Sequence, residues 1–361
     1  MRKLKIFQRF IKFMDQTLLL KTNSQTILDY ITIEFGKYFS QDESQYFAEY
    51  QPIESTQDPS PASWVKNIRE DVSFLKGKVV WAKNSGKVVY REGKYFGTYH
   101  HGLVRGIYDP NKNTVRNLVR DPFRYFNICV GVIDYLFSKA LLQQDIFRIH
   151  AACISKDDKG MLICGSKATG KTTLLMKFLR SGYDFVADDL CYVKFENNEL
   201  ICHPFPKTIK INYNDSERFP KLYQKLKYSK ITTSDEIQKA IIQPEENNFS
   251  IVTREIPITQ IIIPSIIQSP RTSTNSIQPV SAETSCCVVD IVKKKLSFDL
   301  LIPTFRGKDL LNIDYLENPE LIEKQDHLCQ QTLQSYSLKI FKLGLDIEKI
   351  DIKDLIVSSE E

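Results

Sequence analysis

The chain has 361 residues, of which 42% are hydrophobic and 26% are charged, and its formal net charge is +5. These values are ordinary for a globular protein, and the length leaves room for two domains that each have a core. The positive charge is spread along the chain without a long basic block, so we expect no nucleic-acid partner.

The sequence contains no candidate membrane span or leader. Its longest apolar run, residues 258–267, is interrupted by Gln260 and Pro264 and is too short to cross a bilayer. Residues 1–7 lack the uninterrupted apolar stretch of a signal peptide, so we expect neither a leader nor a membrane partner. The eight cysteines include no C-x-x-C pair. This pattern predicts reduced core thiols in a cytoplasmic protein, and not a cysteine metal cluster.

Residues 1–145 are predicted to form a small N-terminal α+β domain. Apolar side chains recur at helical spacing in its first helix, which Ser24 or Thr26 is expected to cap. Turn signals alternate with short β-rich runs in its second half, which predicts an antiparallel meander. The expected elements are a strand at 17–21, a helix at 24–39, a loop at 51–64, the meander at 70–120 and a long apolar helix at 121–143.

Residues 146–361 are predicted to form a second domain, which continues from the first without a flexible linker. Its expected elements, in chain order, are strands at 147–154 and 160–164, a helix at 173–180, strands at 183–187, 190–195, 199–203 and 208–212, helices and loops over 215–248, strands at 258–263 and 337–343, and a terminal helix at 347–356.

The second domain contains the pattern G-x-x-x-x-G-K-[ST], flanked by an apolar strand and a helical pattern. This is the context that a nucleotide phosphate loop requires, because glycines turn backbone N–H groups toward one centre and the helix N-terminus adds positive charge. The alternative is a glycine-containing turn that binds nothing. The residues predicted to bind the nucleotide are Gly165, Ser166, Lys167, Ala168, Thr169, Gly170, Lys171, Thr172 and Thr173.

Two of these residues are expected to have specific roles. The Lys171 ammonium can reach the β- and γ-phosphates as a point charge, and the Thr172 hydroxyl can ligate Mg²⁺. Asp188 and Asp189 follow this loop after one helix and one strand, so they are expected at a strand end on the nucleotide side. One carboxylate can hold Mg²⁺ and the other can take the acceptor's proton, or the pair simply begins a turn.

A resemblance to a known family covers residues 149–193. It is carried by His150 on a strand, the phosphate loop, the helix that ends in Ser181-Gly182-Tyr183, and the strand that ends in Asp188-Asp189. These features resemble the catalytic core of the HPr kinase/phosphorylase-like kinases. Pro204-Phe205-Pro206-Lys207 matches a segment of relatives outside the strict HPr-kinase group. Ala151 and Ala168 stand where true HPr kinases carry glycine, which favours a divergent member with another acceptor.

The resemblance implies an α/β fold, with a P-loop nucleotide domain of the HPr kinase/phosphoenolpyruvate carboxykinase type and a smaller N-terminal α+β domain. It implies ATP and Mg²⁺ as cofactors, Asp188 as the base, Asp189 as a metal ligand with Thr172, and His150 beside the phosphates. Which aspartate is the base stays open from the residues alone. The resemblance also suggests a homo-oligomer, although the sequence specifies no interface.

The predicted function is therefore an ATP-dependent kinase that transfers the γ-phosphoryl group to a hydroxyl, commonly of a serine, in a peptide, a protein or a small metabolite. The alternatives are a nucleotide-binding regulator and an ATPase that a partner protein drives. Lys207 and Arg254 are weaker candidates for contact with phosphate, and either can equally be solvated surface. Arg306, in a loop between Phe305 and Gly307, is a weaker candidate for binding an anionic acceptor or the γ-phosphate, although the sequence does not place this loop relative to the site.

Overall fold

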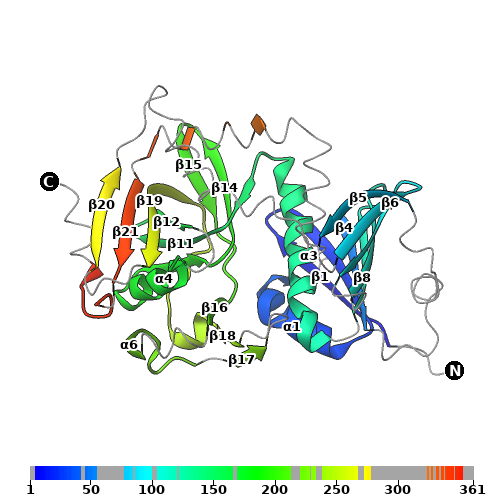
Figure 1. Ribbon diagram of the computed structural model, residues 1–361, viewed down its shortest axis with the longest axis horizontal. Coiled ribbons are helices and arrows are strands. Elements are labelled where there is room, and N and C mark those ends of the chain that lie inside the picture. The colour runs from blue at the N-terminus through cyan, green and yellow to red at the C-terminus, as the bar shows by residue number, and fades with distance from the viewer. Residues whose placement is uncertain are drawn as a thin grey trace. The chain divides into compact units, whose positions relative to one another are not determined.

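The fold is mixed α/β and is built around large sheets (Figure 1). In this computed structural model the described residues are 5–41, 45–54, 77–83, 86–99, 104–119, 122–165, 169–212, 220–227, 229–232, 238–266, 272–277, 323–324, 327, 331–332, 335–336, 338–344 and 346–352. The chain divides into two compact units. The described residues up to Gln144 belong to the first unit, and those from Asp145 on belong to the second, apart from Thr232.

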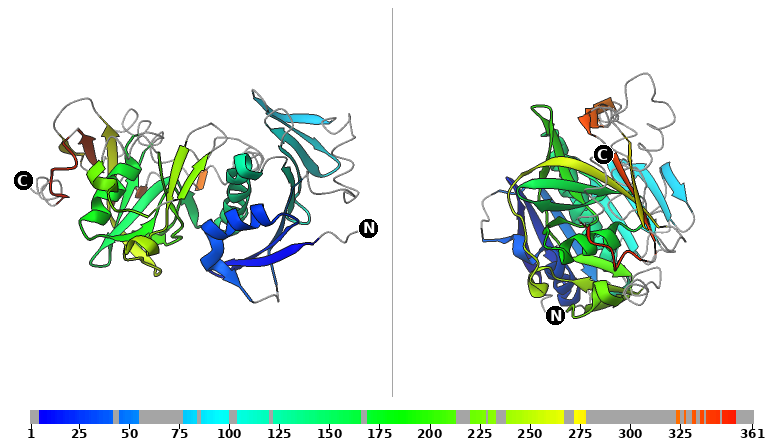
Figure 2. Two further views of the ribbon diagram at one scale, coloured as in Figure 1. Left: turned by 90° about the horizontal axis from the view of Figure 1, so that it is seen from below. Right: turned by 90° about the vertical axis from the view of Figure 1, so that its left-hand side faces the viewer.

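The first unit is a nine-stranded sheet in the order β3-β1-β2-β4-β9-β8-β7-β6-β5. Two helices pack on each other and lie on the same side of this sheet (Figure 2). The elements are β1 Phe7–Phe13, β2 Gln16–Thr22, α1 Gln25–Phe35, η1 Gly36–Tyr38, β3 Phe39–Ser40, β4 Ala48–Glu54, β5 Lys78–Lys83, β6 Gly86–Arg91, β7 Lys94–Tyr99, β8 Val104–Asp109, β9 Thr114–Val119 and α3 Pro122–Leu142.

The meander and the long helix of the first unit are confirmed. Strands β5 to β9 pair antiparallel with their neighbours in the chain, and α3 covers nearly all of the predicted helical range. The first helix ends earlier than predicted, at Phe35, since a 3₁₀ turn and β3 follow it. Ser24 is its N-cap, and the Ser24 hydroxyl accepts a 3.3 Å hydrogen bond from the Ile27 N–H.

The predicted loop at 51–64 is wrong over its first residues, because β4 extends to Glu54. The prediction was misled by Pro52, because proline has no backbone N–H to donate to a neighbouring strand. Strand β4 tolerates it because pairing with β2 ends at Tyr50, so at Pro52 the strand pairs with β9 alone. The rest of the predicted loop lies outside the described residues.

The second unit holds a sheet whose main path is β10-β14-β15-β19-β12-β11-β13, with β21 beside β19 and β20 beside β21. A separate three-stranded sheet has the order β16-β18-β17. The elements are β10 Phe147–Ile149, β11 Ala151–Lys156, β12 Lys159–Cys164, α4 Lys171–Arg180, β13 Asp184–Ala187, β14 Cys191–Glu196, β15 Glu199–His203, β16 Ile209–Asn212, α6 Pro220–Tyr223, β17 Ser229–Thr232, β18 Gln238–Ile242, η3 Glu245–Asn247, β19 Ile256–Ile266, β20 Ser273–Ile277 and β21 Leu338–Leu343.

Three predictions for this unit need correction. Residues 147–154 form two strands, because the chain leaves the ladder with β14 at Ile149 and enters the ladder with β12 at Ala151. Within 215–248, where helices and loops were expected, the structure adds β17 and β18, and β18 gains its order from long-range pairing with β16. Where the terminal helix was predicted, at 347–356, residues 347–349 form a turn, Ile352 is helical, and residues beyond 352 lie outside the described part.

Helix α4 is the centre of this unit's core. It packs against β11 and β12 (Figure 1), and it also contacts β16 and α6. Leu174, Leu175 and Phe178 are fully buried there. Burial of one such side chain contributes about 1.5–3 kcal/mol, so the helix is firmly held. Its first residue, Lys171, is therefore fixed in position by packing that occurs further along the helix.

No helix in the described ranges is both long and apolar enough to cross a membrane. The cysteines within those ranges are free thiols and all are buried, namely Cys129, Cys153, Cys164, Cys191 and Cys202. The other three lie outside the described residues.

Candidate phosphate-binding site

The predicted phosphate loop connects β12 to α4, so its strand–loop–helix context is present. The strand ends at Cys164, and the helix begins at Lys171 with Gly170 as its N-cap at φ +100°. Only glycine adopts that left-handed conformation without strain. Residues 166–168 lie outside the described part. At Gly165 a Cβ atom would come within 2.6 Å of the Thr169 hydroxyl oxygen, so a glycine is needed there for close approach within the loop.

The Lys171 side chain is 6% exposed and turns back to the loop. Its ammonium Nζ donates a 2.7 Å hydrogen bond to the Gly165 carbonyl oxygen. The positive charge of Lys171 therefore lies at the end of the loop that follows β12, beside the N-terminus of α4. Thr172 is half-buried, and Thr173 is buried at 4% exposure.

The acidic pair follows β13, as predicted, and Asp188 is 3% exposed. Its Oδ2 accepts a 3.2 Å hydrogen bond from the Lys210 backbone N–H. Its Oδ1 is buried without a hydrogen-bond partner among the described residues. Burial and the neighbouring Asp189 raise the pKa of Asp188 to about 7, against the opposing effects of the Lys210 N–H and of the Lys171 and Lys210 charges.

Asp189 occupies a strained turn. Its φ is +62°, and the Leu190 N–H donates a 2.8 Å hydrogen bond to the Asp188 carbonyl oxygen. This i to i+2 bond closes a tight turn around a non-glycine residue of positive φ, which is an uncommon backbone conformation. Non-glycine residues in such conformations cluster at binding and catalytic sites, because the strain must be offset by surrounding structure.

Sheet register brings His150 next to both the loop and the acidic pair. Ala151 pairs with Cys164 across β11 and β12, so His150 lies opposite the residue where the loop begins. On its other side Ile149 pairs with Cys191, directly after the acidic segment. His150 is half-buried at the bend between β10 and β11. The sequence motif alone could not place these three segments side by side.

Lys210 is a residue that the sequence reasoning missed. A weak signal was present, because Lys210 lies between Ile209 and Ile211 in an alternating β pattern. Only the fold shows that its backbone reaches Asp188. Lys207, a weaker candidate, is 6% exposed, and its Nζ lies 5.3 Å from the centre of the Phe205 ring.

A second weak candidate, Arg254, does not join this site. Arg254 forms an ion pair with Asp158 in the turn between β11 and β12, which is the end of the hairpin opposite the loop. Its side chain is 69% exposed, in agreement with the solvated-surface interpretation. Arg306 lies outside the described residues.

Within the described ranges, no three His, Cys, Asp or Glu side chains gather to form a metal site. Magnesium in nucleotide sites often uses only one or two protein oxygens, the remainder coming from phosphates and water. The Thr172 hydroxyl and the Asp189 carboxylate are hard oxygen donors that fit this pattern. The unpartnered Oδ1 of the adjacent Asp188 shows that this segment leaves a buried carboxylate oxygen without a protein partner among the described residues.

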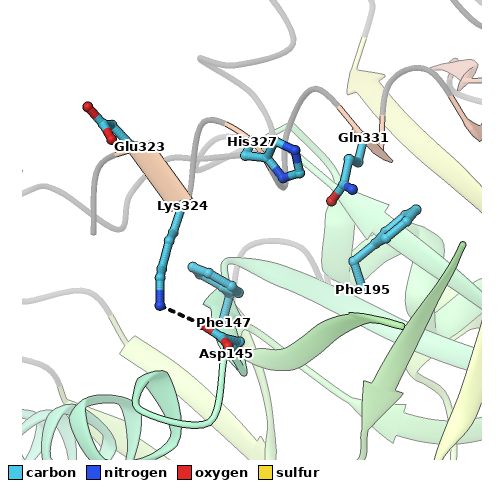
Figure 3. Close-up of a pocket in the computed structure, with 7 residues that line it drawn as sticks. All are labelled: Asp145, Phe147, Phe195, Glu323, Lys324, His327 and Gln331. Atoms are coloured by element: carbon cyan, nitrogen blue, oxygen red, sulfur yellow. Dashed lines mark hydrogen bonds and ion pairs between the residues drawn. The ribbon is translucent and has the colours of Figure 1, made fainter. Parts of the chain in front are cut away.

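A separate cavity of about 480 Å³ lies elsewhere in the second unit (Figure 3). Phe147 and Phe195 lie on its sheet side, and Lys324 Nζ is 3.0 Å from Asp145 at one end. Phe195 is about 13 Å along β14 from Cys191, at about 3.3 Å per residue. The cavity is therefore not the phosphate loop. Its remaining lining residues are Glu323, His327 and Gln331.

Comparison with known proteins leaves the family open. No protein-family profile and no curated protein matches the chain. One similar solved structure is the HPr(Ser) kinase/phosphatase from Coxiella burnetii, with 20% sequence identity and a TM-score of 0.21. The alignment covers 36% of this chain and 76% of that chain. A similarity this weak does not allow that protein's activity to be assigned to this chain, so we infer function from the residues of the site.

Proposed function

We propose that this protein is a Mg²⁺-dependent kinase that transfers the γ-phosphoryl group of ATP to a hydroxyl, with a serine of a peptide or protein, or a small metabolite, as the acceptor. One observation carries the proposal. A buried carboxyl with an unpartnered oxygen, Asp188, lies at the end of the strand that follows a phosphate-loop helix, within the influence of that loop's lysine.

The loop supports binding of the donor. At the two described ends of the loop, the left-handed Gly170 and the closely packed Gly165 are positions that require glycine, as in phosphate loops. In this proposal Lys171 contacts the β- and γ-phosphates, and Mg²⁺ is held by Thr172 and Asp189. The metal supplies charge neutralisation at the phosphates when it is bound. His150 lies next to Ala151, which pairs with Cys164 at the start of the loop, so its backbone is close to the loop.

Asp188 suits the acceptor side of the reaction. A base works best when its pKa lies near the operating pH, and the pKa of this carboxyl is raised to about 7. In the transfer, the acceptor oxygen forms a bond to the γ-phosphorus, the bond from phosphorus to the bridging oxygen of ADP breaks, and the acceptor proton passes to Asp188. ADP and a phosphate ester are the products.

The test is an ATP-turnover assay with Mg²⁺ and a panel of serine peptides and hydroxyl metabolites, read by mass spectrometry for phosphorylated product. Wild type is compared with Lys171→Met, Asp188→Asn and the surface control Lys194→Gln, since Lys194 pairs with Glu196 on β14. Phosphorylated product that disappears in the first two variants alone supports the proposal. ADP formation without a phosphorylated acceptor favours a partner-driven ATPase, and nucleotide binding without turnover favours a regulator.

A further inference from the structure

Arg148 is a buried arginine to which the described residues offer no counter-charge. It is 8% exposed, and it forms no hydrogen bond or ion pair with any described residue, Asp188 and Asp189 included. A guanidinium is not deprotonated in proteins, so this charge is permanent. Buried charges are nearly always paired, because their removal from water is costly. An arginine in this state therefore indicates an anion that binds from outside the chain.

The guanidinium head of Arg148 is open to solvent. Its nitrogens are not among the described side-chain atoms that are sealed from water without a hydrogen-bond partner. The small exposure of the residue therefore includes its head, while the stem is covered, as is common for long cationic side chains on an apolar surface. An anion can approach the head from solvent.

Arg148 lies two residues before His150, on the strand that leads into the candidate phosphate-binding site. Two residues of a strand span about 6.6 Å. Phe147, its neighbour, lines the cavity of Figure 3. Successive side chains of a strand alternate between faces, so the Arg148 side chain leaves the other face of the sheet.

The phosphate loop lies on the other side of His150 along the chain. There Ala151 begins β11 and pairs with Cys164, the residue before the loop. Arg148 precedes His150 on β10, and β10 pairs with β14 and not with the loop strand. We therefore assign Arg148 to the acceptor side of the site and not to the nucleotide phosphates.

His203 is a second buried basic side chain on the same sheet face. Arg148 pairs with Tyr192, and Tyr192 pairs with His203, so the three side chains form one row across β10, β14 and β15. His203 is 7% exposed, and its Nε2 has no hydrogen-bond partner among the described residues. The row spans about 10 Å between the Cα atoms of Arg148 and His203.

The acids closest to this row in the ladder already face other cations. Glu255 Oε1 is 3.0 Å from His203 Nδ1, although the angles are outside those of a hydrogen bond. Glu196 pairs with Lys194 on β14 at 3.0 Å. Within the described part of the chain, Arg148 thus stays the cation of this row that no acid faces.

We propose that Arg148, with His203 beside it, binds a carboxylate of the acceptor, so that the kinase prefers hydroxyls that have a carboxylate close by. This inference rests on the proposed kinase function. A planar guanidinium binds a carboxylate through two parallel hydrogen bonds. The Nε2 of a protonated His203 can donate a further one. An acidic residue beside the serine of a peptide supplies this chemistry, and so does a small hydroxy acid.

The experiment measures kcat/KM on matched pairs of acceptors that differ in one carboxylate. The pairs are serine peptides with glutamate or glutamine beside the serine, and glycerate or its amide. Wild type should prefer the acid by about 10- to 100-fold, as expected for hydrogen bonds to a charged group. The pair that shows the preference identifies the source of the carboxylate. Turnover of these acceptors without any preference would overturn the inference.

Three variants assign the preference to its residue. Arg148→Met should reduce the ratio of the acid to the amide to about one. Arg148→Lys should keep a smaller preference, because lysine restores the charge without the fork. The control Arg254→Gln changes an exposed arginine away from the site and should keep the wild-type ratio. A wild-type ratio in Arg148→Met would contradict the inference, even if both rates fell, since the residue would then be structural.

A binding measurement without ATP separates this inference from the kinase proposal. Thermal melts are recorded for wild type and Arg148→Met during titration with succinate, a dicarboxylate, or with inorganic phosphate. Succinate at ten times its Kd should raise the melting temperature of wild type by about 3 °C and leave Arg148→Met unchanged. Stabilisation by phosphate that persists in Arg148→Met belongs to the loop. Equal effects of succinate on both proteins, or none on wild type, would overturn the inference.

Without added anion, Arg148→Met should melt at a higher temperature than wild type, because it removes a buried charge that lacks a partner. A lower melting temperature would show that the charge is compensated within the protein, against the inference. Succinate binding that depends on Arg148, in a protein that phosphorylates no acceptor, would support the carboxylate site and remove the kinase proposal.

Discussion

The ammonium of Lys171 lies 2.7 Å from the carbonyl oxygen of Gly165, so the first residue of α4 is bonded to the residue at which the loop leaves β12. This contact closes the loop on itself, and it holds a buried charge close to where phosphates would bind. Several expected outcomes depend on this arrangement.

The first prediction concerns that lysine. Lys171→Met should weaken ADP binding by about 10- to 100-fold, because a hydrogen bond to a charged group contributes roughly 1.5–3 kcal/mol. Isothermal titration calorimetry of ADP with Mg²⁺ measures this effect, with Lys194→Met as the surface control. Equal affinities in wild type and Lys171→Met would mean that the loop does not bind nucleotide phosphates.

The second prediction compares two glycines at opposite ends of α4. Gly170 and Gly182 have φ of +100° and +81°, and both adopt backbone conformations that cost an L-residue roughly 1–2 kcal/mol. Gly170→Ala and Gly182→Ala should therefore lower thermal stability by similar amounts. Only Gly170→Ala should also weaken ADP binding, because Gly182 lies at the helix end away from the loop. If both variants lost ADP affinity to a comparable extent, the effect of Gly170→Ala on binding would come from lower stability and not from the loop.

The third prediction is that Asp188→Asn stabilises the protein at high pH while it abolishes turnover. The folded-state pKa of this acid is raised from 3.8 to about 7, so the folded protein binds the proton more tightly than the unfolded chain does. The carboxyl's contribution to stability is thus complete below pH 3.8 and is lost as the pH rises through 7. Above that pH a buried carboxylate is ionised with one oxygen unpartnered.

The measurement is a thermal melt of both proteins in EDTA. At pH 8.5 the Asn variant should melt at least about 3 °C higher, which corresponds to roughly 1 kcal/mol for a domain of this size. At pH 5 the two melts should lie closer together, because the wild-type carboxyl is then neutral. A lower melting temperature of the variant at both pH values would show that the Asp188 charge is well compensated.

The fourth prediction separates charge from strain at Asp189. Asparagine tolerates the positive φ of this position, whereas alanine does so at a cost of about 1–2 kcal/mol. Asp189→Asn should keep the melting temperature but raise the Mg²⁺ concentration needed for half-maximal turnover. Asp189→Ala should show both effects. A Mg²⁺ titration of ATP turnover tests this, and an unchanged Mg²⁺ requirement in Asp189→Asn would exclude Asp189 as the metal ligand.

Local sequence was sufficient for much of the fold. Period-two patterns between turn signals predicted the meander of β5 to β9, and a helical period predicted α3. Prediction failed where long-range pairing decides the structure. Strand β4 forms in spite of Pro52 because β9 pairs with it, and β18 forms because β16 does. The split at His150 follows from a change of partner strand, which local periodicity cannot reveal.

The sequence by itself determined a loop with glycines at two required positions, a lysine at the start of a helix, and an acidic pair one strand later. Spacing along the chain carries that information, because the residues between the lysine and the acidic pair are enough for one helix and one strand. Only the tertiary structure decided that Asp188 is buried with one oxygen that lacks a hydrogen-bond partner among the described residues, that Asp189 lies in a tight turn with positive φ, and that the Lys210 backbone N–H reaches Asp188. Burial and hydrogen bonding depend on which strands become neighbours, and the register of β10, β11 and β16 sets that here.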